Sequence, residues 1–304
     1  MTSTTQAPHT AATRPLELSA AAVVVFLCLC WGFNQVAVKL ALTDIPPLTQ
    51  AWIRSAGAAV IIWIYARTRG ISLDLRGETL KAGLLAGVLF GLEFIFIYRA
   101  LLYTTASRAT LFIYAAPFVV VLGSHFLVPN DRFRWAQWAG LVMSFAGLLL
   151  AFGLPTPSAN AYQLLGDVLA LGGGIAWGLT TLVVKSTSLA RAAPEKTLQY
   201  QLVISAPMLA LAALLFGETM TRMPGALPLA SLIYQTVWVV SLTFLIWFMM
   251  VAKYSASRLS AFTFLTPLFG VFAGHLVLGD PITPAFAGAV ALVIGGLILV
   301  NRPR

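Results

Sequence analysis

The segment CWGFNQVAVK, residues 30–39, occurs a second time in this chain as AWGLTTLVVK, residues 176–185. The two copies start 146 positions apart and have Trp, Gly, Val and Lys in matching places. A second match, at a spacing of 150, pairs Ala106, Ser107, Arg108, Phe112, Pro117, Val121 and His125 with Ala256, Ser257, Arg258, Phe262, Pro267, Val271 and His275. The sequence therefore consists of two copies of one unit of roughly 145 to 150 residues.

The composition is that of a membrane protein. Hydrophobic residues make up 59% of the chain and charged residues 10%, whereas soluble domains have about 25% charged residues. The charges cluster between apolar runs of about 20 residues, the length that a helix needs to cross the hydrocarbon layer. The first run, from Leu18, is too long for a signal peptide and no small-residue cleavage site follows it, so residues 1–17 are predicted to be a disordered cytoplasmic leader.

The sequence predicts an all-α membrane protein with ten transmembrane helices. All spans are expected to be helical because a backbone in lipid must satisfy its own polar groups. Proline-containing segments such as 46–47, 155–158, 224–228 and 280–281 separate them. The expected spans are 18–40, 47–66, 80–102, 106–128, 134–153, 164–186, 195–216, 229–252, 257–279 and 283–301. They divide into repeats at 18–153 and 154–301, followed by a cytoplasmic tail at 302–304.

The basic residues predict the orientation. The net charge of +9 comes from Lys and Arg in the connections, where they record membrane topology rather than nucleic-acid binding. Most of them fall on one side if both termini are cytoplasmic, in an inner membrane. Five spans per repeat is an odd number, so the second repeat is inverted relative to the first, as in many secondary transporters. Lys39 and Arg108 should then lie near the outer face, and Lys185 and Arg258 near the inner face. Their side chains are expected to reach the lipid headgroups, or alternatively to pair across the two gates.

Several segments resemble the EamA family of the drug/metabolite transporter superfamily. They are Leu-Cys-Trp-Gly-Phe-Asn at 29–34, Pro-Pro-Leu-Thr at 46–49 followed by Arg54, Ala-Leu-Leu-Tyr-Thr-Thr-Ala-Ser-Arg at 100–108, and Ala-Lys-Tyr-Ser-Ala-Ser-Arg at 252–258. The resemblance covers nearly the whole chain. It implies a ten-helix exporter with inverted repeats around a central cavity, working by alternating access. It does not identify a substrate, because the family transports many.

Polar side chains next to each tryptophan are candidates for a substrate site. Trp31, Asn34 and Gln35 share one face of the first helix, and Trp177, Thr180 and Thr181 have the same spacing in the second repeat. Polar groups at mid-membrane depth face protein or a wet cavity. Either they line the cavity, or they only join neighbouring helices, a contact worth about 0.6–2 kcal/mol.

Glu93 is an isolated acid near the centre of the third expected span. The position matched to it by the spacing of 150 holds Thr243, so the repeat does not impose an acid. An unpaired carboxylate at that depth costs about 2.5–3.5 kcal/mol on insertion scales. Three roles remain open: binding a substrate ammonium group, carrying a coupled proton, and forming a buried pair with Arg54 or Arg99.

Pro117 and Pro267 lie in the middle of the fourth and ninth expected spans. Each removes a backbone donor and weakens the helix there, so they are either paired hinges or static kinks that make room for a ligand. Tyr114 and Phe264 precede them by about one turn and are candidates for stacking on a substrate.

These patterns predict a secondary transporter that exports small organic metabolites, with amino acids as the expected substrates. An exporter of lipophilic cations is the alternative, since an acid and aromatic rings also suit cations. A membrane enzyme acting on lipids would need clustered His, Asp, Glu or Ser, and no such cluster, Walker loop, His-Glu-x-x-His run or serine elbow occurs. Cys28 and Cys30 are interpreted as buried apolar groups and not metal ligands. No cofactor other than a coupled proton is expected; the partners are a small solute and membrane lipid, and the protein is expected to be a monomer.

Overall fold

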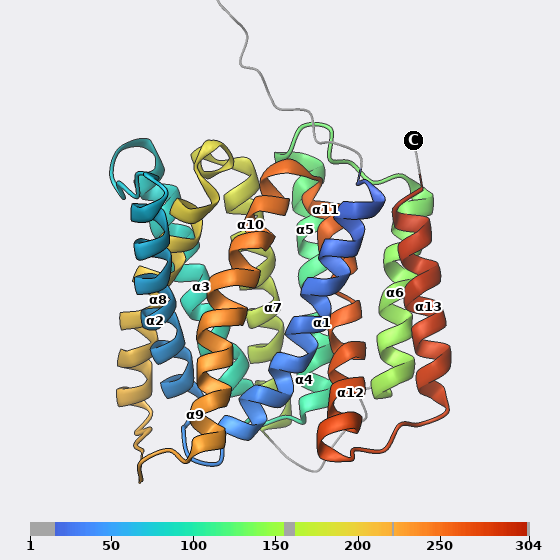
Figure 1. The fold of residues 1–304 in the computed structure, drawn as a ribbon. Coiled ribbons are helices and arrows are strands. Elements are labelled where there is room, and N and C mark those ends of the chain that lie inside the picture. Colours follow the sequence, from blue (N-terminus) through green and yellow to red (C-terminus); the bar gives the residue numbers. More distant parts are fainter. Residues whose placement is uncertain (1–15, 155–161, 221, 303–304) are drawn as a thin grey trace, which may run out of the picture.

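The structure, a computed structural model, describes residues 16–154, 162–220 and 222–302 and is a bundle of helices standing side by side (Figure 1). The predicted leader at 1–17 lies almost entirely outside the described residues, as does most of the predicted tail.

The helices follow the apolar runs of the sequence. In the first half they are α1 (Leu18–Ala41), α2 (Pro47–Thr68), the short 3₁₀ turn η1 (Gly77–Thr79), α3 (Leu80–Ala100), α4 (Ala106–Ile113), α5 (Ala116–Leu127) and α6 (Trp135–Phe152). In the second half they are α7 (Gln163–Ser186), η2 (Ser188–Arg191), α8 (Pro194–Leu215), α9 (Ala226–Ile233), the π-helical segment η3 (Tyr234–Thr243), α10 (Phe244–Lys253), α11 (Ala256–Phe262), α12 (Leu265–Leu278) and α13 (Ala285–Val300).

The two halves start their helices with the same local chemistry. Helices α2 and α8 each have a proline, Pro47 or Pro194, as the first residue, where its missing N–H has no helical partner to lose. Helices α4 and α11 each begin after a hydroxyl cap. The Thr105 hydroxyl accepts from the Arg108 N–H at 3.3 Å, and the Ser255 hydroxyl accepts from the Arg258 N–H at 3.1 Å.

Among the described residues, eight helical segments are long and apolar enough to cross a membrane. They cover the expected spans except those at 47–66 and 283–301. These two are also helical, as the 22-residue α2 and the 16-residue α13, which is apolar but shorter. The chain is therefore a multi-pass all-α membrane protein.

Helices of the first half pack mainly on helices of the second half. The most extensive contacts pair α6 with α13, α3 with α7, α2 with α8, and α1 with α12; α7 also packs on α4 and α5. Each of these contacts has a counterpart when the two repeats are exchanged. α6·α13 and α2·α8 map onto themselves, α1·α12 maps onto α7·α5, and α3·α7 maps onto the contacts of α1 with α9, η3 and α10.

The glycine of each Trp-Gly pair lies at one of these crossings. A Cβ atom on Gly32 would come within 2.6 Å of the Phe269 Cβ on α12. A Cβ on Gly178 would come within 2.7 Å of the Val119 Cβ on α5. Because no side chain fits there, glycine lets α1 approach α12 and lets α7 approach α5.

Candidate functional site

Trp31 is at the centre of a first aromatic cluster. Its indole Nε1 donates a hydrogen bond of 2.9 Å to the Thr243 hydroxyl, which donates in turn to the Val239 carbonyl at 2.6 Å. The indole ring meets Phe244 and Trp247 edge-on, with centroids 6.0 and 5.4 Å apart. Helix α1 is thus joined to the segment η3 and α10 by a polar contact inside an aromatic environment.

Tyr114, Trp177 and Phe264 form a second aromatic cluster. Tyr114 meets Trp177 edge-on and Phe264 at a tilt, with 5.8 Å between ring centroids in both cases. Tyr114 and Phe264 are buried and Trp177 is half-buried. The three rings come from the α4–α5 junction, from α7 and from the α11–α12 junction. The structure therefore brings together three of the predicted site residues, while Trp31 lies in the other cluster.

The predicted polar residues differ in what they bond. The hydroxyl of Thr181 donates to the Trp177 carbonyl at 3.3 Å and that of Thr180 to the Ala176 carbonyl at 2.8 Å, so both hydroxyl protons are used within α7. On α1, the Asn34 Oδ1 is buried without a hydrogen-bond partner among the described residues. Gln35 is exposed.

Glu93 lies in α3, directly before Phe94, whose ring the Arg54 guanidinium covers at 4.3 Å from the centroid. Arg54 is only 3% exposed. Among the described residues, no ion pair joins Glu93 to Arg54 or to Arg99. Arg99 instead donates to the Tyr103 hydroxyl at 3.2 Å. The predicted buried pair is therefore absent as a direct ion pair, and Arg54 instead contacts the ring of the neighbouring Phe94.

Both prolines follow a break in the helix. Helix α4 ends at Ile113 and α5 contains Pro117 in its first turn, while α11 ends at Phe262 and Pro267 is in the first turn of α12. Pro207, by contrast, lies inside α8 without ending it. The breaks place Tyr114 and Phe264 at the two junctions, where helical hydrogen bonding is interrupted. Whether the junctions move remains a prediction.

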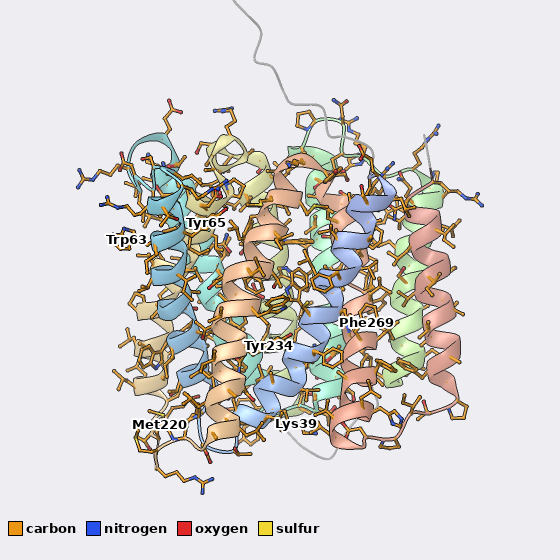
Figure 2. The ribbon with its side chains drawn as sticks, viewed as in Figure 1. Lys39, Trp63, Tyr65, Met220, Tyr234 and Phe269 are labelled. Atoms are coloured by element: carbon orange, nitrogen blue, oxygen red, sulfur yellow. The ribbon has the colours of Figure 1, made fainter. Side chains whose placement is uncertain are left out.

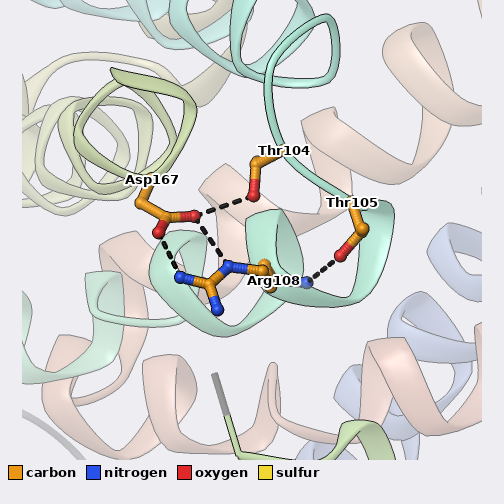
Figure 3. A network of polar contacts seen from close by, with 4 residues as sticks. All are labelled: Thr104, Thr105, Arg108 and Asp167. Atoms are coloured by element: carbon orange, nitrogen blue, oxygen red, sulfur yellow. Dashed lines mark hydrogen bonds and ion pairs between the residues drawn. The ribbon is translucent and has the colours of Figure 1, made fainter. Parts of the chain in front are cut away.

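One face of the bundle carries a polar network around Asp167, at the start of α7 (Figure 3). Arg108 forms an ion pair with Asp167, and its Nε donates to the Asp167 Oδ1 at 3.2 Å. The Thr104 hydroxyl donates to the same oxygen at 2.8 Å. The expectation that Arg108 reaches lipid headgroups is therefore wrong, because a carboxylate of α7 is within reach.

At the opposite end of the bundle, Lys185 and Asp131 make buried or partly buried hydrogen bonds. Lys185 Nζ donates to the carbonyls of Val251 and Tyr254 at 2.6 and 2.9 Å, so it does not reach headgroups as expected. Nearby, Asp131 is 3% exposed and accepts from the Ser255 hydroxyl and from the Ser257 N–H at the start of α11.

At the end of α1, by contrast, Lys39 and its partner Asp280 are exposed. Lys39 lies at the end of the bundle away from Trp63 and Tyr65 (Figure 2). Its Nζ is 3.9 Å from the Asp280 carboxylate, and both side chains are more than half exposed.

Segment η3 and the first residue of α10 contribute groups that the sequence patterns did not select as site residues. Thr243 and Phe244 line the first cluster, and Tyr234 donates from its hydroxyl to the Cys30 carbonyl at 3.1 Å. Figure 2 shows Tyr234 and Phe269 on either side of α1. The sequence did contain one indication of Phe244, because the repeat spacing of 150 pairs it with Phe94. A π-helix changes the side-chain register, is rare, and occurs often at functional sites.

The comparisons with known proteins agree with this architecture. The model of the EamA-like transporter family matches the chain twice, at residues 18–153 and 164–302. The chain belongs to the EamA-like transporter family. A solved crystal structure with 21% sequence identity has a TM-score of 0.77, covering 93% of this chain and 96% of the other, which supports the fold.

Two curated relatives cover nearly the full length of this EamA-like transporter. The "Uncharacterized transporter YvbV" of Bacillus subtilis (strain 168) is 29% identical over 92% of this chain and 91% of its own. The "Probable amino-acid metabolite efflux pump" of Salmonella typhimurium (strain LT2) is 24% identical over 91% of this chain and 93% of its own. Their names describe transporters rather than enzymes.

Proposed function

We propose that this EamA-like transporter is a secondary carrier that exports small organic metabolites, amino acids foremost, across the bacterial inner membrane. The observation that carries the proposal is the pair of aromatic clusters around Trp31 and Trp177, on equivalent helices of the two repeats. Rings of this kind suit the apolar part of a small solute, and the nearby Glu93 suits an ammonium group. The printed name of the Salmonella relative supports amino acids as the substrate class.

The ten-span, inverted arrangement is part of the proposal. Helices α1 and α7 run in opposite directions in Figure 1, and α1 begins at the end of the bundle at which α13 ends. These directions support two halves related by a two-fold axis in the membrane plane, with both termini in the cytoplasm and α2 and α13 as further spans.

The two faces support alternating access. Asp131 lies six residues after His125 and Asp280 lies five residues after the matching His275, and each directly follows a residue with positive φ, Asn130 or Gly279. The two carboxylates therefore occupy comparable places in the two repeats, one residue out of the spacing of 150. Asp131 is buried against the start of α11, whereas Asp280 is half exposed and has only a distant contact with Lys39. The end of the bundle with Lys39 also carries the Arg108–Asp167 ion pair, so the two ends differ at these carboxylates and not in every contact. A difference of this kind supports a carrier whose two ends open in turn.

Export from proteoliposomes tests the proposal. Liposomes containing only the purified protein are loaded with an equimolar mixture of the proteinogenic amino acids, and the external medium is analysed by mass spectrometry. We expect some of the amino acids to be released faster than from protein-free liposomes. The Glu93→Gln variant should insert into the membrane normally but release these amino acids more slowly. If no amino acid is released but tetraphenylphosphonium is, the cation-exporter alternative replaces this one, because the acid and rings suit cations too.

A further inference from the structure

Arg54 and Glu93 are two opposite charges inside helices α2 and α3. Arg54 is 3% exposed, and its guanidinium lies on the Phe94 ring, next to Glu93 in the chain. The ion pairs among the described residues are Lys39–Asp280, Arg108–Asp167 and Arg222–Asp44, none of which includes Arg54 or Glu93. Ionisable side chains inside a membrane protein are unfavourable unless paired, and mark functional sites by default.

The fold itself does not require these charges. Arg54 is the eighth residue of α2, and the eighth residue of the equivalent α8, which also begins with proline, is Gln201. Glu93 corresponds to Thr243, while the neighbouring Phe94 and Phe244 are alike. The second repeat therefore builds the same place with neutral side chains.

The second repeat holds neutral side chains at these two positions, although their hydrogen bonding is satisfied to different extents. Thr243 accepts from the Trp31 indole and donates to a backbone carbonyl of its own helix. Gln201 is fully buried; its amide N–H donates to the Thr197 carbonyl at 3.4 Å, and its Oε1 has no hydrogen-bond partner among the described residues. Since packing is achieved without charge in one half, a reason other than packing is needed for the charges in the other half.

We propose that Arg54 and Glu93 together bind a zwitterion, with the guanidinium on its carboxylate and the Glu93 carboxylate on its ammonium group. The proposal rests on the proposed function and adds Arg54 as the residue that selects amino acids. A guanidinium presents parallel N–H donors that match a carboxylate, which explains arginine rather than lysine at this position. Because the two charges do not form an ion pair, both remain available to a ligand.

This arrangement predicts discrimination among solutes of one shape. An amine that lacks the carboxylate leaves Arg54 unmatched, and an acid that lacks the amine leaves Glu93 unmatched. A site with buried polar groups rejects an analogue that leaves them unpaired. Phenylalanine should therefore be preferred over phenethylamine and over 3-phenylpropionate, although all three have the same ring for the aromatic clusters.

Uptake of these three labelled compounds into proteoliposomes tests the pair. Wild-type protein should transport phenylalanine at least about tenfold faster than either analogue, the loss expected for one missing charge-assisted contact. Arg54→Gln should lose that preference, so that phenethylamine becomes at least as good a substrate as phenylalanine. Glu93→Gln should slow both phenylalanine and phenethylamine.

Arg99→Gln is the matched control, because Arg99 lies on α3 but stacks on Phe216 at 4.0 Å from the ring centroid. It should keep the wild-type preference. If Arg54→Gln is not monodisperse on gel filtration, Arg54→Lys is used in its place. Lysine keeps the positive charge but lacks the two parallel N–H donors of the guanidinium group. The preference for phenylalanine over phenethylamine should still fall.

Two failures are distinguishable. An unchanged preference in the Arg54 variant overturns the zwitterion pair alone, while amino-acid export stands. Absence of phenylalanine uptake by the wild-type protein, together with no amino-acid release in the export assay, overturns the proposed function and this inference with it.

Discussion

The close crossing of α1 and α12 makes Gly32→Ala a sharp test of the packing. The new Cβ would lie 2.6 Å from the Phe269 Cβ and 2.7 Å from the Gly270 backbone N. Carbon atoms pack at about 3.5–4.0 Å, so α12 must retreat by about 1 Å. Overpacking of this kind costs about 1–3 kcal/mol in the free energy of unfolding.

Gly270→Ala is the matched control, because it adds the same methyl group at the same crossing. A Cβ there meets only ordinary contacts, at 3.7 Å from the Gln35 Cδ and from the Gly32 carbonyl oxygen. Both variants gain about 0.5–1 kcal/mol from replacing glycine inside a helix. The difference between them therefore isolates the clash.

Thermal unfolding of the purified proteins in detergent measures that difference. At about 2–4 °C per kcal/mol, Gly32→Ala should unfold roughly 2 to 12 °C below Gly270→Ala. Equal unfolding temperatures for the two variants would refute the crossing geometry, and with it the explanation of the Trp-Gly pair as a close helix contact.

Three further predictions concern single contacts. The Gly225 N–H and Arg222 hold the pKa of Asp44 below its usual range, so this loop contact stabilises the fold above about pH 4 and is lost as pH falls further. Thermal unfolding of the wild type should show an acid-sensitive part that Asp44→Asn lacks. Asp131→Asn removes a buried charge that accepts bonds at the start of α11, and hydrogen exchange of that segment should speed up about tenfold or more. Trp31→Phe keeps an aromatic ring but loses the indole hydrogen bond to Thr243, so the transport rate in proteoliposomes should fall by roughly twofold to tenfold. An unchanged rate would show that this hydrogen bond is not needed for transport.

The sequence predicted the helices well because the signals for them are local. Apolar runs, the prolines that start α2 and α8, and the hydroxyl caps of α4 and α11 act within a few residues. The breaks before Pro117 and Pro267 are local in the same sense. The apolar runs and the proline breaks between spans were predicted, whereas the hydroxyl caps were not, and Pro117 and Pro267 were expected in the middle of continuous spans.

Contacts between distant helices were not predictable in this way. Arg108 was expected at the headgroups because no rule of spacing links it to Asp167, 59 residues later. Trp31 and Trp177 were expected to be equivalent, yet one bonds Thr243 on a π-helical segment and the other packs against Tyr114. Periodicity assumes 3.6 residues per turn, and it therefore misplaces side chains where the turn is wider.

The repeat is most informative where the two copies differ. Shared residues such as Gly32 and Gly178 mark what both halves need for packing, because the same crossing is built twice. At the place of Arg54 and Glu93, the same backbone holds charged groups in one half and neutral groups in the other. A neutral copy in the same chain is an internal control for what the fold requires. The charges are therefore best explained by a ligand that approaches one side of the pseudo-symmetric centre with its own two charges.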